Sequence, residues 1–445
     1  MKRESVLASG VFALAAAAPG RVIMATAALA ALAANCAAVL ADGTSWASGL
    51  ELLAAKGIFS CGIGFCVWRL TRHLPASVAL AASAQFIGLF MYRASDPSIF
   101  GLCCSPWVLY CWLRIADGGS LRDSLLWMAC LLGVNVAEMS AGTAREAWVL
   151  LLWMNLSGAC VLSMSARPSR EKGWLLCGLA GTAVVFAVIG SQAWPTSFRA
   201  LGDLGAVHGA QHALQIQPGL FVGLFDGAFY RPFRVYSDGV NPSSNFFILT
   251  GLLWLVVRWR SMLSDRRAAA LAVSSLPALM LVFGVIPPDV IGRLPYLGKI
   301  MGVDEAFSPA LIVVLAVLAG FGWREAWQRL GSPDGRREAI AVLVLLVLIY
   351  ASYLGTAQAI VRSAYATLTW GEFVRLGPFF QAYGLSLIAA SAALMWAMHR
   401  SLRLRSLSLA VAVCAALSLA ALHWRMAARP CSAAPASPAE LRGRP

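Results

Sequence analysis

Residues 339–356 read AIAVLVLLVLIYASYLGT, a continuous apolar run without a charged side chain. Arg336, Arg337 and Glu338 stand directly before it, so charge resumes at its border. A helix needs about 20 predominantly apolar residues to cross the hydrocarbon core of a bilayer. Lipid satisfies no backbone hydrogen bond, so a spanning segment of this kind must be helical. This stretch therefore predicts a transmembrane α-helix, and it decides the class of fold.

The whole chain shares this character. Of its 445 residues, 59% are hydrophobic and 13% are charged, and the mean hydropathy is +0.72. A soluble domain carries roughly 25% charged residues, so there are too few here to cover a core of this size with polar surface. The net charge of +14 is scattered between apolar runs and lacks the clustered face that nucleic-acid binding needs. The cysteines fall mostly in or beside apolar runs, which predicts neither a disulfide framework nor a structural metal site.

The apolar runs predict an all-α, polytopic helical bundle with about twelve or thirteen spans over residues 1–424. Several runs are shorter than a full span, so one or two are expected to be re-entrant. Residues 425–445 are rich in Ala, Pro and Ser and are expected to form a disordered tail. The runs lie near residues 22–41, 52–68, 77–92, 98–113, 124–137, 147–165, 174–193, 245–257, 268–286, 309–322, 339–356, 380–398 and 407–424.

Alternate connections between these runs are short and basic, and by the positive-inside rule they face the cytoplasm. They are Arg69 to Arg72, Arg114 to Arg122, Arg167 to Lys172, Arg258 to Arg267, Arg324 to Arg337 and Arg400 to Arg405. The N-terminus is expected on the same side, in a bacterial inner membrane. The intervening connections then face outward and include three long ones, at 191–245, 287–308 and 355–379.

No ATP-binding P-loop or dinucleotide fingerprint occurs, so chemistry is expected in the membrane or on its outer face. The outward connections alternate acidic residues, which can act as general bases or bind a metal, with arginines, which can clamp a phosphate. Arg93 and Asp96 must lie near the headgroups, because their connection is short. The same holds for Glu138 and Arg145. Asp304 lies in a longer outward connection.

The segment from Phe225 to Asn245 combines aromatic residues with Tyr230, Arg231, Arg234 and turn-forming residues. Aromatic faces stack on sugar rings and arginine binds phosphate, so a glycolipid site is one interpretation. A packed interfacial loop is the other, and the sequence leaves both open.

Four passages resemble the GT-C superfamily of membrane glycosyltransferases, in particular its bacterial YfhO-like branch. They are Leu53 to Arg69 with Ala76 to Arg93, then Ser105 to Tyr110 (SPWVLY), Glu138 to Trp148, and Ile286 to Gly322. The resemblance implies transfer of a sugar from a polyprenyl-phosphate donor to a cell-envelope acceptor on the outer face. The chain departs from that family in its first outward connection, which is short and offers only Asp42 and Glu51.

The resemblance also implies roles for individual residues. Asp42 or Asp96 would deprotonate or orient an acceptor hydroxyl, and Arg93, Arg231 or Arg234 would hold the lipid phosphate. The remaining substrate contacts would come from Glu138, Arg145, Tyr230 and Asp304. Family members often use a divalent cation, here Mg²⁺ or Mn²⁺, and a carboxylate pair could bind one.

Two other classes stay open. An O-antigen polymerase or ligase also has about a dozen spans and a polyprenyl-linked substrate, and the long connection at 191–245 suits that class. A lipid-linked sugar flippase or transporter would normally show ionisable residues within its spans. Run interiors such as 339–353 and 410–422 carry no charge, so they lack the ionisable residues that a proton or ion relay needs.

Overall fold

The computed structural model describes residues 46–400, apart from 89, 91–97, 118, 142–143, 194–214, 227–228, 230–242, 294–302 and 363–369. All regular structure in these residues is helical, and no strand occurs among them. The predicted all-α bundle is therefore confirmed. The expected first span at 22–41, the run at 407–424 and the tail lie outside the described residues.

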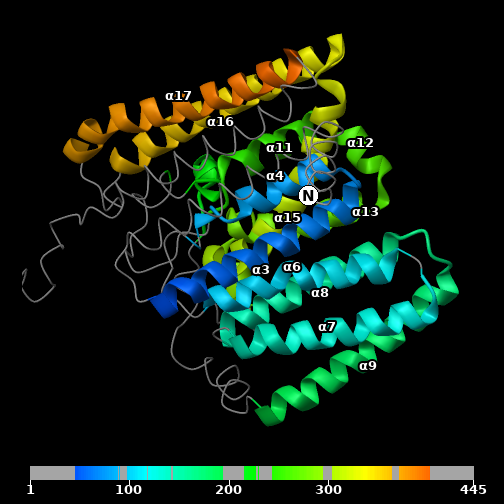
Figure 1. Cartoon of the computed structure of the whole chain (residues 1–445). Coiled ribbons are helices and arrows are strands. Elements are labelled where there is room, and N and C mark those ends of the chain that lie inside the picture. Colours follow the sequence, from blue (N-terminus) through cyan, green and yellow to red (C-terminus); the bar gives the residue numbers. More distant parts are fainter. Residues whose placement is uncertain are drawn as a thin grey trace, which may run out of the picture.

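The helices lie in layers, with α9 on one side and the neighbouring helices α16 and α17 on the other (Figure 1). In chain order they are α3 (Trp46–Thr71), α4 (Leu74–Ala84), α6 (Ser98–Ala116), α7 (Leu121–Ala141), α8 (Ala144–Met164), α9 (Ser169–Ala193), the 3-10 helix η1 (Pro218–Leu224), α11 (Phe246–Val257), α12 (Trp259–Ser264), α13 (Arg266–Val282), α14 (Pro288–Arg293), α15 (Val303–Arg329), α16 (Pro333–Arg362) and α17 (Trp370–Arg400).

Five of these helices are long and apolar enough to cross a membrane: Glu51–Thr71, Ala147–Met164, Ser169–Gln192, Ala306–Arg329 and Pro333–Arg362. Of the apolar window in α15, 89% is buried, against 17% in α9 and 22% in α16. The central helix is therefore α15, while α9 and α16 present apolar side chains outward, as a lipid-facing helix does. The chain is a multi-pass membrane protein, and the total of twelve or thirteen spans stays a prediction.

Close contact between α11 and α15 forms the centre of the bundle. The Phe247 and Trp323 rings stack with centroids 4.5 Å apart, and Trp323 Nε1 donates to Phe247 O at 3.0 Å. A Cβ on Gly322 would lie 1.9 Å from Gly251 O, so only glycine permits this approach of the two backbones. Small residues at helix crossings are how membrane helices gain packing without a hydrophobic driving force.

An ion-pair network ties three helices together at Asp117, just after α6. Its carboxylate pairs with Arg69 at the end of α3 and accepts a hydrogen bond from Arg267 Nη1 at 2.5 Å, from the start of α13. The Asp117 side chain is only 11% exposed. The end of α3, the end of α6 and the start of α13 therefore lie together.

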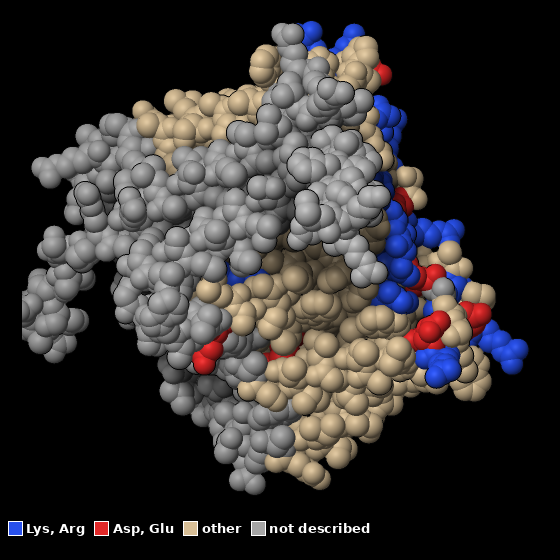
Figure 2. Space-filling model, in the orientation of Figure 1, with Lys and Arg blue, Asp and Glu red and all other residues tan. Residues whose placement is uncertain are grey.

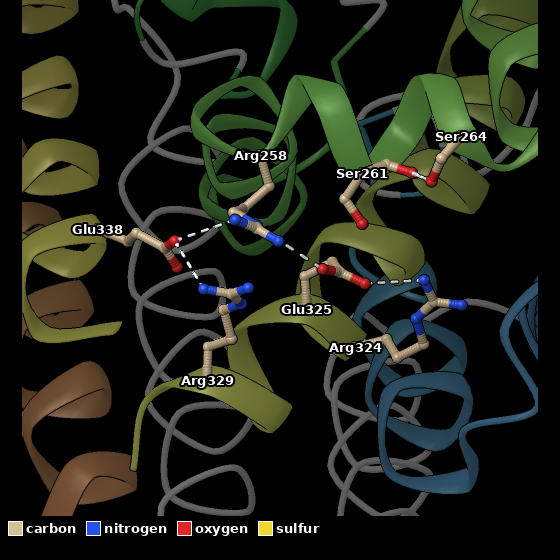
Figure 3. A network of polar contacts seen from close by, with 7 residues as sticks. All are labelled: Arg258, Ser261, Ser264, Arg324, Glu325, Arg329 and Glu338. Carbon is tan, nitrogen blue, oxygen red and sulfur yellow. Dashed lines mark hydrogen bonds and ion pairs between the residues drawn. The ribbon is translucent and has the colours of Figure 1, made fainter. Parts of the chain in front are cut away.

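A second network joins α11, α15 and α16 (Figure 3). Arg258, just after α11, pairs with Glu325 of α15 at 3.8 Å and with Glu338 of α16 at 3.3 Å. Arg329 also reaches Glu338, at 3.4 Å, and Arg324 pairs with Glu325 at 2.8 Å. Each carboxylate thus lies within ion-pair distance of two guanidinium groups, which compensates its burial.

We call this end of the bundle, defined by the Asp117 and Glu338 networks, the ion-pair end. On the face shown in Figure 2, the charged side chains gather mainly along one edge. His399 Nδ1, at the end of α17, lies 2.5 Å from Leu330 O, and Arg167 Nη2 donates to Ser124 Oγ at 3.1 Å. The five predicted basic connections up to Arg337 therefore share one end within the described residues, as their alternation indicated; residues 401–405 of the sixth lie outside them. Which face of the membrane this end occupies stays a prediction.

His73 begins the short helix α4 at the ion-pair end. Its Nδ1 accepts a hydrogen bond from Ala76 N at 3.2 Å, and its ring lies edge-on to Trp327. Burial, together with the positive charge of Arg324, lowers the pKa of His73 to about 4. A neutral imidazole is the form that can accept this N-cap hydrogen bond.

Several helices are longer than the apolar runs that predicted them. α16 continues to Arg362 and α17 begins at Trp370, so both extend into the connection expected at 355–379. α14 and the first turns of α15 likewise occupy parts of 287–308. Helical geometry can continue beyond the apolar layer, because the backbone hydrogen bonds along a helix do not depend on lipid.

Candidate functional site

Two short helices meet end to end inside the bundle at Asn245. The side chain of Asn245 donates from Nδ2 to Ser83 O at the end of α4, at 2.7 Å, and its Oδ1 accepts from Ile248 N in the first turn of α11, at 3.1 Å. Gly88 N donates to Ser243 O at 2.7 Å. We call this the Asn245 junction.

The Asn245 junction lies partway across the bundle. With 11 and 12 residues, α4 and α11 are about 16 and 18 Å long, against about 30 Å for the hydrocarbon core. Both reach the ion-pair end, α4 at His73 and α11 at Arg258. Irregular backbone at such a depth is tolerated only inside protein or beside a cavity, and broken helices of this kind form substrate sites in membrane transporters.

The middle of the long connection at 191–245 also packs into the bundle. In the described part, the side chains of Ile216, Leu224 and Phe225 are 0% exposed. Gln215 Nε2 donates to Leu281 O and Ile286 O, both at 2.8 Å, beyond the end of α13. Leu224 O accepts from both the backbone N and the hydroxyl of Ser244, which joins this segment to the Asn245 junction.

An aromatic cluster lies beside a carboxylate at the end of this segment. The Tyr383 hydroxyl of α17 donates to Asp226 Oδ2 at 2.5 Å. The Phe229 ring lies 4.9 Å from the Tyr353 ring, 5.5 Å from the Tyr383 ring and 6.1 Å from the Tyr350 ring, measured between centroids. Aromatic faces with a hydrogen-bonding carboxylate are a combination that recognises sugars.

Glu138 lies in the last turn of α7, at the end of that helix away from the ion-pair end. Its side chain is 0% exposed, and neither Oε1 nor Oε2 has a hydrogen-bond partner among the described residues. It faces the first half of α6 near Cys103 and Cys104. It is the one predicted substrate residue whose side chain falls within the described structure, and it is a buried acid rather than a solvated loop charge.

Lys56 is a second buried ionisable residue on a helix. It lies in α3, within the apolar run at 52–68, and only 8% of it is exposed. Ionisable residues inside membrane helices are costly and usually functional. The expectation that spans lack such residues holds for α16 around 339–353, but it is wrong for α3.

The other predicted residues cannot be compared with this geometry. Asp42, Arg93, Asp96, Tyr230, Arg231 and Arg234 lie outside the described residues. Arg145 and Asp304 lie in the first turns of α8 and α15, but their side chains are not described. Their convergence on one outward cavity therefore stays a prediction.

Sequence reasoning missed the partners that meet Asp226. Tyr383 lies on α17, and no local pattern relates it to a residue so far back in the chain. The signal that was available is the apolar spacing of residues 216–229, which is unusual for a solvated connection. It favours the packed-loop interpretation for the described part of Phe225 to Asn245, and the glycolipid interpretation stays open.

No set of three or more His, Cys, Asp or Glu side chains within the described ranges is placed to hold a metal ion. The candidate carboxylates Asp42 and Asp96 lie outside those ranges. A divalent cation therefore stays an expectation.

Comparison with known proteins adds little. No family model matches the chain, and no curated protein matches it. The structure is similar to the crystal structure of ArnT from Cupriavidus metallidurans in the apo state, with 16% sequence identity and a TM-score of 0.42. The match covers 84% of this chain, and this chain spans 62% of the length of ArnT. A likeness at this level does not establish a shared activity.

Proposed function

We propose that the chain is a membrane glycosyltransferase of the GT-C kind. It transfers a sugar from a polyprenyl-phosphate donor to a cell-envelope acceptor on the outer face of the membrane. The observation that carries the proposal is the polar, aromatic interior away from the ion-pair end, where Asp226 and Tyr383 lie beside the aromatic cluster. An ordinary packed bundle has no need of such groups in an apolar interior, because each must be hydrogen-bonded to be tolerated.

The Asn245 junction adds physical support. A sugar on a lipid phosphate is held at membrane depth, so a site for it needs polar groups within the bundle. Ser243 and Ser244 are 1% and 3% exposed; Ser243 O accepts from Gly88 N, beyond the end of α4, and Ser244 donates to Leu224 O at the end of η1. Broken helices supply polar backbone at that depth without a lipid-exposed loop.

In the proposed mechanism, Asp42 or Asp96 deprotonates or orients the acceptor hydroxyl as it attacks the anomeric carbon. The bond from that carbon to the phosphate oxygen breaks with inversion. Arg93, Arg231 or Arg234 stabilises the charge on the departing lipid phosphate. These roles rest on the sequence resemblance and on the chemistry of the residue types.

The test is a transfer assay with purified protein in lipid nanodiscs. Radiolabelled polyprenyl-phosphate hexoses are supplied with cell-envelope lipid acceptors, and native chain is compared with Asp42→Asn and Asp96→Asn. We expect one of these variants to lose about 100-fold or more in rate, the range for removing a general base. Asp123→Asn, an exposed residue at the ion-pair end, serves as the matched control and should transfer like native chain. Unchanged rates in both test variants would remove the catalytic assignment.

A polymerase or ligase of O-antigen type shares the same support, because the long middle connection contributes to the interior site. The two functions differ in the donor. A GT-C enzyme of the proposed kind takes a sugar from a polyprenyl monophosphate. A polymerase or ligase would transfer an oligosaccharide from a polyprenyl diphosphate. Supplying both donors in the same nanodisc assay separates them.

A further inference from the structure

Glu138 differs in its contacts from the other buried acids of the bundle. Asp117, Glu325 and Glu338, at the ion-pair end, each contact arginine side chains. Glu138 is fully buried, and in the part of the chain that the structure describes neither of its carboxylate oxygens has a hydrogen-bond partner. The difference does not follow from depth alone, because Glu325 is also nearly buried, at 6% exposed, and is paired.

A carboxylate removed from water without hydrogen-bond donors raises the free energy of the folded state. The thiols of Cys103 and Cys104, which are weak donors, lie close enough to interact electrostatically with the Glu138 carboxylate. Among the described residues no side chain supplies the missing donor, so a ligand group or a proton can supply it. An unpaired acid on a membrane helix is by default a candidate for function.

The position of Glu138 limits what such a ligand can be. It stands 17 residues after Leu121, which places it about 26 Å along α7 from the ion-pair end. Nothing described around it supplies a positive charge that would draw a phosphate there, and a carboxylate repels a phosphate. A hydroxyl or an amino group, by contrast, donates the hydrogen bond that the carboxylate lacks.

Building on the proposed function, we propose that Glu138 accepts hydrogen bonds from the hydroxyl or amino groups of the sugar on the lipid-linked donor, and not from the donor's phosphate. Glu138 then selects for the presence of a sugar on the lipid. The phosphate is left to arginine side chains elsewhere in the protein. The two parts of the donor are recognised by groups of opposite charge.

The experiment measures binding rather than turnover. Native chain, Glu138→Gln and Ser140→Ala are placed in nanodiscs, and the dissociation constants of a polyprenyl-phosphate hexose and of the bare polyprenyl phosphate are measured by native mass spectrometry. Ser140 is the matched control, because it lies in the same turn of α7 but is exposed and bonded to Val136 O. Melting temperatures are recorded in parallel without lipid ligand.

We expect Glu138→Gln to weaken binding of the hexose lipid about tenfold or more, as loss of a charge-assisted hydrogen bond does. Binding of the bare polyprenyl phosphate should stay unchanged. The melting temperature of Glu138→Gln should equal or exceed that of native chain, because a buried acid without a hydrogen-bond partner among the described residues is removed. Ser140→Ala should match native chain in all three measurements.

Other results overturn the inference. Equal weakening of both lipids would place Glu138 at the phosphate or show a general loss of structure. A lower melting temperature in Glu138→Gln would show that the acid is structural. Unchanged binding in Glu138→Gln, while native chain still prefers the hexose lipid, removes the role of Glu138 and leaves the proposed function standing. If native chain binds neither lipid, the proposed function falls as well.

Discussion

Asp117→Ala tests whether the ion-pair end holds the bundle together. The Asp117 carboxylate forms ion pairs with two guanidinium groups from two other helices, Arg69 at the end of α3 and Arg267 at the start of α13. Removing it leaves both positive charges without their acid, in a region where the two side chains are 19% and 31% exposed. The variant should therefore lower the free energy of unfolding.

The expected size follows from the burial. Breaking a fully buried pair by removing one partner costs about 3–5 kcal/mol, whereas an exposed pair contributes about 0–1 kcal/mol. Asp117 is 11% exposed and its partners are partly hydrated, so water compensates some of the loss. We expect a decrease of about 2–3 kcal/mol, nearer the buried limit than the exposed one.

The assay is reversible unfolding in mixed micelles, followed by tryptophan fluorescence. Glu171→Ala is the control, because Glu171, in the first turn of α9, is 55% exposed, and its buried partner Arg167, just before α9, keeps its hydrogen bond to Ser124 Oγ. That variant should change the free energy by about 0.5 kcal/mol or less. If Asp117→Ala and Glu171→Ala differ by no more than the experimental error, the network does not stabilise the fold and the reasoning fails.

A double-mutant cycle measures how much the pair of Asp117 and Arg267 contributes to this stabilisation. Asp117→Ala, Arg267→Ala and the double variant should show a coupling of about 1–2 kcal/mol, since each single change already removes the hydrogen bond between Asp117 and Arg267. Raising the salt concentration should reduce the effect of Glu171→Ala more than this coupling, because buried pairs are screened less.

Two further variants test local packing and titration. His73 has a pKa of about 4 in the folded chain and 6.5 as its ordinary value. The neutral imidazole therefore contributes its full stabilisation of the fold above pH 6.5, and this stabilisation is lost as the pH falls toward 4. Unfolding at pH 7.5 and pH 5 should differ by about 1–2 kcal/mol from this group, whose ring is partly hydrated, and His73→Asn, which keeps a capping oxygen, should remove that difference. An equal pH dependence in both proteins would contradict this. Gly322→Ala should destabilise the bundle by about 1–3 kcal/mol, because the new Cβ meets the backbone of Gly251, whereas Gly57→Ala, with open space around it, should be neutral or stabilising by up to about 1 kcal/mol. The same unfolding assay measures both glycine variants, and equal effects of the two would refute the close approach of α11 and α15.

The helical class and the shared end of the basic connections could be predicted from sequence for a physical reason. Arginine is costly within lipid, so its position along the chain marks where helices leave the apolar layer. Arg258 and Arg267 stand on either side of α12, and the structure pairs them with acids from other helices. The sequence could place these residues at one end. It could not say which acid each would meet.

Burial of polar residues inside the bundle could not be predicted in the same way. Lys56 lies in an apolar run and reads as a tolerated interruption, although the structure buries it. Asn245 reads as an ordinary N-cap of α11, and its bond to Ser83 O depends on how α4 and α11 are arranged in space. Contacts between segments 162 residues apart in sequence leave no local pattern to read.

Buried acids have different roles at the two ends of the bundle, and stability measurements on variants can tell these roles apart. Glu325 and Glu338 connect helices through arginine, so removing either should destabilise the free protein. Glu138 has no hydrogen-bond partner among the described residues, so its burial is a cost that a ligand or a proton can offset. Stability is commonly sacrificed at functional positions in this way. Replacing a buried acid by its neutral amide should therefore distinguish the two kinds of residue. The change should lower the free energy of unfolding where the acid holds helices together. It should leave that free energy unchanged or raise it where the acid binds a ligand.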